Sequence, residues 1–179
     1  LHLPMQSGSS RILKVMNRHY DKEKYLDLVE KIRKAVPDIS LTTDIIVGFP
    51  GETEEDFQET LDVVEKACFD TAFTFIYSKR SGTPAAKMED QVPEDVVKDR
   101  FDRLLKLVQE KGREASSRFQ GEVQEVLVET ESKEKGIFTG RTQYNLLVHF
   151  SGTEDLLGKY IKVRLDTCKG FYYLGSRVE

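Results

Sequence analysis

Residues 42–57 read TTDIIVGFPGETEEDF and predict a β-strand, a loop and an α-helix in succession. Ile45, Ile46 and Val47 form a short apolar run with strand character, and the turn at residues 48–51 ends it. Thr53 is placed to cap the helix that follows. In parallel α/β folds and barrels, ligands bind at the C-terminal ends of the strands. We therefore expect a binding site at the loop after this strand.

The charge of this loop restricts the ligand. The loop lacks the lysine and the glycine spacing of a phosphate-binding loop. Acidic residues crowd the start of the helix, namely Glu52, Glu54, Glu55 and Asp56. Their charge predicts repulsion of a polyphosphate, but not of a ligand that carries an ammonium or sulfonium cation.

The neighbouring segments continue the α/β pattern as far as about residue 120. We expect a short helix capped by Ser9 or Ser10, a helix from Asp21 to Pro37, and strands over residues 39–47 and 72–77. A long helix over residues 93–119 has a predicted buried stripe of Val97, Phe101, Leu104, Leu105 and Val108. These elements form βα steps in succession, the arrangement of an α/β domain.

The pattern changes near Gly121. Short strand-like runs follow, separated by glycine, asparagine and charged turns: VQEVLVE, IFTGRT, NLLVHF, YIKVRL and FYYLG. Such runs predict a small β-barrel. The sequence therefore predicts two domains, residues 1–120 and residues 121–179.

Composition excludes several classes of protein. A net charge of −4 with abundant lysine and glutamate is typical of a soluble cytoplasmic protein rather than one dominated by nonspecific nucleic-acid contacts. No apolar run is long enough to span a membrane. Cys68 and Cys168 stand far apart, so we expect two reduced thiols and neither a metal site nor a disulfide framework. The three histidines have no spacing typical of a metal site.

Three blocks of the sequence occur in the order of a known family. They are HLPMQSGSSRILKVMNRHY (residues 2–20), the stretch quoted above, and FTFIYSKRSGTPAAKM (residues 73–88). Together they resemble the radical S-adenosylmethionine (SAM) methylthiotransferases, and within them the branch that acts on N6-isopentenyladenosine in tRNA. The family's Cys-x-x-x-Cys-x-x-Cys motif and N-terminal domain precede these blocks. Because the chain opens on Leu1 without them, we expect the C-terminal part of such an enzyme.

The resemblance implies a fold and a chemistry. The fold would be an α/β domain, the C-terminal part of a radical SAM (βα) barrel, followed by a small all-β domain, an OB-like TRAM β-barrel. The parent enzyme would use SAM and two [4Fe-4S] clusters to add a methylthio group to C2 of the modified adenosine beside the anticodon. The cluster ligands are absent from this chain, so the isolated chain is expected to be inactive and to contain no catalytic residue. The implied partners are SAM and the anticodon stem-loop of tRNA.

The candidate SAM-binding residues lie at the ends of the predicted strands: Gln6, Ser7, Asp44, Gly48, Phe49, Tyr77 and Arg80. From the residues alone, ordinary turn and cap chemistry is the favoured interpretation of Gln6, Ser7 and Ser9. The resemblance instead implies that Gln6 and Ser7 contact SAM and that Ser9 caps a helix. Asp44 could instead pair with Arg11 or Arg18. Gly48 would let the backbone approach a flat ring, which Phe49 would cover.

The candidate RNA-binding residues lie in the predicted barrel: Arg141, Asn145, His149, Lys162 and Arg164. Arg141 and Asn145 rank first, because with Thr142 they resemble the family's GRT-x-x-N pattern. Phe138, Tyr144 and Phe150 are interleaved with these polar groups, and exposed aromatic rings next to cations would stack on RNA bases. A barrel core made of the same rings is the alternative. Acidic and basic side chains nearly balance after residue 121, so charge alone does not indicate RNA binding.

Two other interpretations stay open. A sibling methylthiotransferase would act on N6-threonylcarbamoyladenosine of tRNA or on an aspartate of a ribosomal protein. Alternatively, the chain would serve only as an RNA-binding module.

Overall fold

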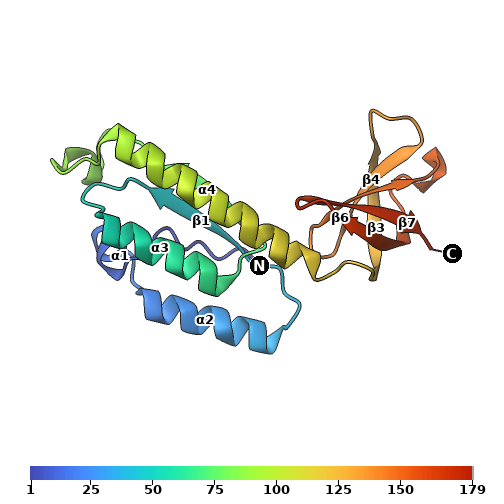
Figure 1. Cartoon of the computed structure of the whole chain (residues 1–179), viewed down its shortest axis with the longest axis horizontal. Coiled ribbons are helices and arrows are strands. Elements are labelled where there is room, and N and C mark those ends of the chain that lie inside the picture. The colour runs from blue at the N-terminus through green and yellow to red at the C-terminus, as the bar shows by residue number, and fades with distance from the viewer. Residues whose placement is uncertain (179) are drawn as a thin grey trace. The chain divides into compact units, whose positions relative to one another are not determined.

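The computed structural model describes residues 1–178 and divides into two compact units, Leu1–Lys111 and the part from Gly112 onward. The division falls within one long helix, α4 (Glu94–Ser117), rather than at its end (Figure 1). A domain boundary at residue 120 therefore stays a prediction.

The first unit alternates helices and strands. Its elements before α4 are α1 (Ser10–Val15), α2 (Lys22–Ala35), β1 (Thr42–Val47), α3 (Glu54–Ala67), β2 (Thr71–Ile76) and the short 3-10 helix η1 (Ala85–Lys87). Ser9, Asp21 and Thr53 cap the first three helices through side-chain oxygens that accept backbone N–H groups. Thr53 and Asp56 form a reciprocal capping box, which fixes the start of α3 just beyond the Gly-Phe-Pro-Gly turn.

The two strands of this unit are parallel. Asp44 of β1 lies opposite Phe73 of β2, and Ile46 lies opposite Phe75. Helix α3 makes the crossover between them, as parallel pairing requires. On the other side of β1, single parallel bridges join His2 to Thr42 and Gln6 to Ile45. Residues 2–6 thus run beside β1, and all three segments end at the same edge.

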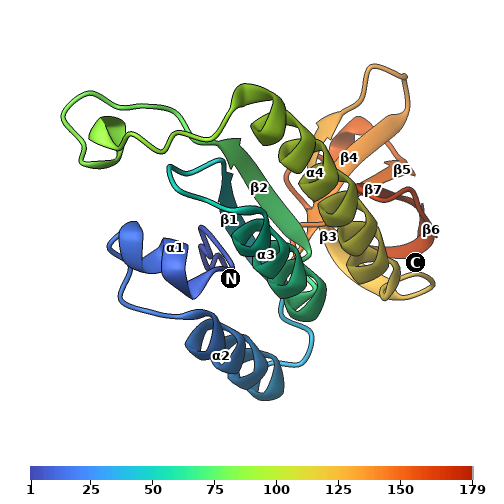
Figure 2. The ribbon, with the colours of Figure 1, turned by 60° about the vertical axis from the view of Figure 1, so that its left-hand side comes forward.

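The two faces of this sheet differ. Thr43, Ile45 and Val47 of β1 are fully buried and point toward the helices. Their cluster includes Tyr25 of α2, Phe57 and Val64 of α3, and Leu104 of α4. The opposite face contains Asp44, Ile46, Phe73 and Phe75, and both phenylalanines are 51% exposed. Because successive side chains of a strand point to opposite faces, half of the strand residues lie on the face away from the core. The segment after β2 extends beyond the ends of both strands (Figure 2).

The second unit is a closed five-stranded β-barrel. Its strands are β3 (Val123–Glu131), β4 (Ile137–Thr142), β5 (Leu147–Ser151), β6 (Tyr160–Cys168) and β7 (Tyr172–Arg177). They are joined in the order β3-β4-β5-β7-β6, and β6 pairs with β3 to close the barrel. Alternate residues such as Val126, Phe138, Val148, Val163 and Tyr173 fill the interior. The predicted fold class, α/β followed by a small OB-like barrel, is confirmed.

Neither an extended apolar helix nor a disulfide occurs in residues 1–178. None of the helices there is both long and apolar enough to cross a membrane. Cys68 and Cys168 are free thiols. Cys68 is exposed and ends α3 in a left-handed conformation, with φ 48°.

Edge pairing predicts a difference in local stability. Each barrel strand has a partner on both sides, whereas β2, within residues 1–178, is paired on one side only. Amide hydrogens of β3 to β7 should therefore exchange more slowly than those of β2. Hydrogen exchange followed by mass spectrometry measures this directly. Equal protection of β2 and the barrel strands would mean that a second copy or another contact completes the sheet.

The start of α3 predicts a pH-dependent stability. Burial alone would raise the pKa of Asp56, but hydrogen bonds from Arg11, Ser9 and Thr53 outweigh it and hold this pKa well below its ordinary value. The stabilisation is thus present above the unfolded-state pKa, about 4, and is lost as pH falls below it. At pH 7, Asp56→Asn should destabilise the first unit by about 2 kcal/mol, because hydrogen bonds to charged groups contribute about 1.5–3.

The measurement is urea unfolding followed through NMR amide signals of α3, at several pH values. The difference between wild type and Asp56→Asn should shrink from pH 5 toward pH 2. Asp27→Asn is the control, because Asp27 forms only an exposed helical pair with Lys31. A constant difference at every pH would contradict the assignment to the Asp56 charge.

Candidate functional site

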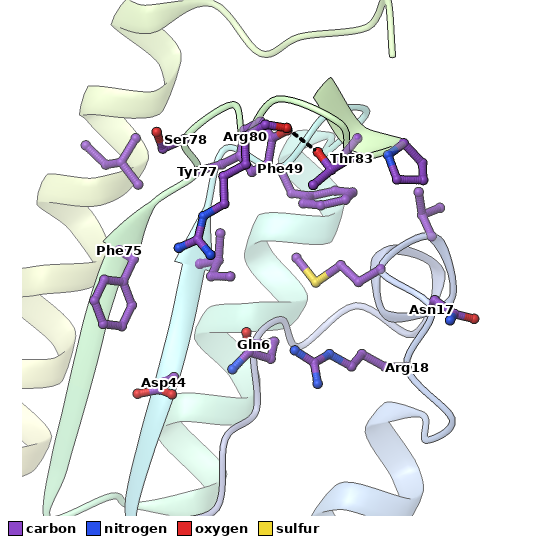
Figure 3. Close-up of a pocket in the computed structure, with 16 residues that line it drawn as sticks. Gln6, Asn17, Arg18, Asp44, Phe49, Phe75, Tyr77, Ser78, Arg80 and Thr83 are labelled. Carbon is purple, nitrogen blue, oxygen red and sulfur yellow. Dashed lines mark hydrogen bonds between the residues drawn. The ribbon is translucent and has the colours of Figure 1, made fainter. Parts of the chain in front are cut away.

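The C-terminal ends of β1 and β2 line a cavity of about 820 Å³ in the first unit (Figure 3). Its walls come from the segment beside β1, the end of α1, both strands and the loop after β2. Five of the residues predicted from the sequence line it: Gln6, Asp44, Phe49, Tyr77 and Arg80. Segments far apart in the chain therefore meet at one place because their strands are parallel and end together.

Ser7 and Gly48 do not line the cavity. Ser7 is 1% exposed, and its Oγ accepts the backbone N–H of Ser9. Gly48 has φ +75°, and a Cβ there would lie 2.6 Å from Cγ2 of Val97 in α4. Close approach of the Gly48 backbone to a flat ligand stays a prediction. The glycine is required by its backbone conformation and by a helix side chain.

Gln6 occupies an unusual backbone conformation at the cavity wall. Its φ is 66°, in the left-handed region that few side chains adopt. Its N–H donates to Asp44 O at 2.8 Å, and its carbonyl accepts from Ile46 N at 2.8 Å. These two bonds to β1 hold the residue in place, and its side chain and that of Arg18 line the same cavity (Figure 3). Such retained strain is typical of binding sites.

Asp44 is only partly buried in β1. Its side chain is 29% exposed, and Oδ2 lies 3.4 Å from Nε2 of His2. Arg11, one of the two structural partners considered for Asp44, binds Asp56 instead. Arg18, the other, lines the same cavity. The carboxylate of Asp44 is thus available to accept hydrogen bonds from a hydroxylated or cationic ligand.

Phe49 and Tyr77 form one apolar wall. Their ring centroids are 5.3 Å apart in an edge-to-face arrangement, and Phe49 is 7% exposed. The Tyr77 N–H donates to Val47 O at 2.8 Å, which extends the strand pairing into the loop. Tyr77 Oη is buried and has no hydrogen-bond partner among the described residues. A buried hydroxyl without a partner is costly, so this atom is poised for a ligand or a water molecule.

Two arginines bring positive charge to the cavity. Arg80 lies on the exposed loop after β2, where its carbonyl accepts the Thr83 hydroxyl at 2.8 Å. Figure 3 shows its guanidinium extending from the loop toward β1. Arg18 was not predicted as a ligand contact. The sequence feature that could have indicated it is Asn17, a residue type that often follows the end of a helix in the left-handed conformation. Asn17 has φ 59° just after the end of α1, and Arg18 follows it at the cavity.

Arginines pair with most of the acidic residues of the turn. Three of them have arginine partners: Glu52 with Arg100, Glu54 with Arg100 and Arg103, and Asp56 with Arg11. Hydrogen bonding from Arg103, against a smaller effect of burial, lowers the pKa of Glu54 to about 2. These ion pairs offset part of the negative charge on which the predicted repulsion of a polyphosphate rests, and the compatibility of the loop with a cationic ligand stays a prediction.

The polar residues predicted for RNA lie in the second unit, but two of them are already engaged. Arg141 donates to Glu129 Oε2 at 3.2 Å and to Asn145 Oδ1 at 3.1 Å. Asn145 has φ 64° in the turn between β4 and β5. This pair therefore stabilises a turn. Lys162 is exposed on β6.

The aromatic residues predicted to contact RNA are mostly inside the barrel. Phe138 and Phe150 are 1% and 2% exposed. Tyr144 is half-buried and stacks on Phe119, with centroids 4.6 Å apart. The exposed rings are Tyr160 and Phe171, at 69% and 71%. Core packing is thus the correct interpretation of the first three rings.

Models of two known families match separate parts of the chain. The radical SAM superfamily matches residues 1–64, and the TRAM domain matches residues 117–178. The first match covers Gln6, Asp44 and Phe49 of the cavity, and the second covers the closed barrel.

Curated relatives match the chain along its whole length. Proteins named tRNA-2-methylthio-N(6)-dimethylallyladenosine synthase are 57% identical in Lachnoclostridium phytofermentans, over 100% of this chain, and 59% identical in Acetivibrio thermocellus, over 99%. A third, from Clostridium perfringens, is 53% identical over 100% of the chain. The chain spans only 37–40% of the length of these relatives.

A solved structure supports the fold. Coproporphyrinogen III oxidase from Escherichia coli, a radical SAM enzyme, matches 92% of this chain and 40% of its own with a TM-score of 0.53 and 16% identity. At that identity the likeness concerns the fold alone. Taken with the two domain matches, it means that this chain contains a radical SAM region followed by a TRAM domain, and that it corresponds to part of the longer relatives that align along its whole length.

Proposed function

We propose that the cavity at the ends of β1 and β2 binds S-adenosylmethionine. The observation that carries this proposal is the convergence of Gln6, Asp44, Phe49, Tyr77 and Arg80 on one cavity of about 820 Å³. Its size falls in the range of small-molecule and cofactor sites.

The lining fits each part of this cofactor. Phe49, Ile46 and Phe75 offer apolar surface for an adenine ring. Arg80 offers a guanidinium for the carboxylate of the methionyl group, and Asp44 a carboxylate for its ammonium group or for ribose hydroxyls. Tyr77 Oη supplies a buried hydroxyl to which none of the described residues is hydrogen-bonded. When bound, SAM supplies an activated sulfonium group to the reaction, while these residues bind and orient it.

Iron-sulfur clusters do not fit the residues of this chain. A [4Fe-4S] cluster takes cysteine thiolates as ligands, usually four, and the chain has 2 cysteines, one in each compact unit. Within residues 1–178, no group of three His, Cys, Asp or Glu side chains is placed to hold a metal ion. The chain contributes cofactor binding, and the two clusters implied by its family would depend on other protein segments.

We further propose that the protein containing this chain methylthiolates a modified adenosine beside the anticodon of a cytoplasmic tRNA. The relatives carry this activity in their names, and their identity of 53–59% favours it over the sibling substrates. The second unit would dock the anticodon stem-loop. Within it, the exposed Tyr160 and Phe171 are better placed to stack on bases than the buried rings, with the exposed Lys162 available for a phosphate.

Tyr77→Phe tests the cofactor proposal. Because Tyr77 Oη has no hydrogen-bond partner within residues 1–178, its removal should leave the stability of the chain within about 0.5 kcal/mol of wild type. It should weaken SAM binding about fivefold, the equivalent of one lost hydrogen bond. An NMR titration of the chain with SAM measures the affinity and identifies the perturbed residues.

Tyr20→Phe is the matched control, because Tyr20 Oη donates to Met5 O at 3.0 Å and its loss should cost about 1 kcal/mol of stability without affecting SAM. Perturbed amides should cluster at the cavity walls. SAM that perturbs residues elsewhere, or that does not bind wild type, would contradict the proposal.

Phe171→Ala tests the RNA surface. If Phe171 stacks on a base, the variant should lose about 1–3 kcal/mol of affinity for an anticodon stem-loop, with no change in the salt dependence. Lys162→Ala should instead lower the slope of log K against log salt by about 1 if Lys162 contacts a phosphate. Fluorescence anisotropy at several salt concentrations separates the two effects.

The control is Leu157→Ala, because Leu157 is exposed at 44% but has no aromatic ring. Loss of affinity in this variant equal to that of Phe171→Ala would indicate a general surface effect and contradict stacking.

A further inference from the structure

Helix α4 places a cation in its buried stripe. Arg100 is 5% exposed, between the apolar positions Val97 and Leu104 of the same face. Its Nη1 donates to Glu52 Oε1 at 2.9 Å and to the Glu52 carbonyl at 3.1 Å. Its Nε donates to Glu54 Oε2 at 3.2 Å. One guanidinium therefore holds both the main chain and the side chain of the residue that follows the Gly-Phe-Pro-Gly turn.

The carboxylate of Glu52 in turn holds the start of that turn. The side chain is 2% exposed, and both of its oxygens lie 3.3 Å from the backbone N of Gly48. Gly48 directly precedes Phe49, whose ring forms a wall of the cavity. A continuous set of contacts thus runs from α4 through Glu52 and the Gly48 amide to a residue that lines the cavity.

This buried ion pair is weak evidence for a purely stabilising role. A buried ion pair is often no more stabilising than a packed apolar pair of the same volume. Burial raises the pKa of the Glu52 carboxyl, while the Gly48 amide and Arg100 oppose that shift and nearby Asp56 adds to it. Gly51 N also donates to Asp90 O at 2.8 Å, and Glu52 N to Phe49 O at 2.9 Å, so the turn is closed around the buried pair.

We propose that Arg100 is a positioning residue for the cavity, acting through Glu52 to fix the Gly48–Phe49 turn against the ligand. The inference rests on the proposed binding of SAM in this cavity. Arg100 does not line the cavity, so its effect on a ligand would be indirect. Its role is to hold the amide of Gly48, and through it the ring of Phe49, in the geometry that the ligand requires.

The first test needs no ligand. In Arg100→Gln, the Gly48 N–H should exchange with solvent at least about tenfold faster than in wild type, because its buried acceptor is no longer held in place. The NMR signals of Gly48 and Phe49 should shift, while those of the α3 core residues Val63 and Val64 stay unchanged. Unchanged exchange at Gly48 would overturn the proposal.

The matched control is Arg103→Gln. Arg103 lies one turn further along α4 and binds Glu54 and Asp99, but it does not bind Glu52. A general weakening of α4 would affect both variants equally. The proposed role affects Gly48 exchange in Arg100→Gln only, so equal effects would overturn it.

The second test measures SAM affinity. Arg100→Gln should bind SAM at least about tenfold more weakly than wild type, since small displacements of a positioning group cause losses of this size. Arg100→Lys, which keeps a charge for Glu52, should recover part of the loss. If wild type binds SAM and Arg100→Gln binds it equally well, the positioning role is wrong. If wild type does not bind SAM, the proposed function fails, and Gly48 exchange still decides whether Arg100 holds the turn.

A double variant covers the case in which Arg100→Gln does not fold. Glu52→Leu with Arg100→Met replaces the buried pair by apolar groups of similar volume, a change that folded proteins tolerate. It should retain the circular dichroism spectrum of wild type and still show faster Gly48 exchange and weaker SAM binding. Normal Gly48 exchange in this folded variant would contradict the proposal.

Discussion

Parallel pairing of β1 and β2 is the constraint on which the first unit depends. Two parallel strands cannot be joined by a tight turn, so α3 must cross back over the sheet before β2 begins. The crossover brings the C-terminal ends of both strands to the same edge. The segment of residues 2–6 lies beside β1, bonded to it through its backbone, and it ends at that edge with Gln6. The cavity exists because three chain segments stop there together.

Much of this architecture was predictable from local sequence. Thr53 and Ser9 cap their helices as expected, and the apolar run at Ile45 is the core of β1. The barrel strands match the predicted runs because turn-forming residues separate them. Gly136 and Gly170 are examples, and both have positive φ. The convergence of the cavity residues was predictable from the rule that ligands bind at the C-terminal ends of parallel strands. No single residue indicated it.

The remaining features depend on tertiary contacts that no local pattern encodes. Sequence spacing does not distinguish Phe138, which fills the barrel, from Phe171, which is exposed at a turn. A glycine with positive φ looks the same whether its missing side chain makes room for a ligand or for Val97. Arg100 was not recognised because an arginine in an apolar stripe usually extends to solvent. Its partner Glu52 lies 48 residues away in the chain.

The contact between Gly48 and Val97 makes sequence change at the two positions unequal. Val97 could be exchanged for a smaller residue, which would leave a small void of moderate cost. Position 48 could then tolerate a methyl group sterically, but its φ of +75° would still oppose any residue with a Cβ. Substitution of Val97 by a smaller residue therefore does not allow a residue other than glycine at position 48. In an alignment of this family, the glycine should remain fixed while its neighbour varies, without the paired substitutions that mark most contacts.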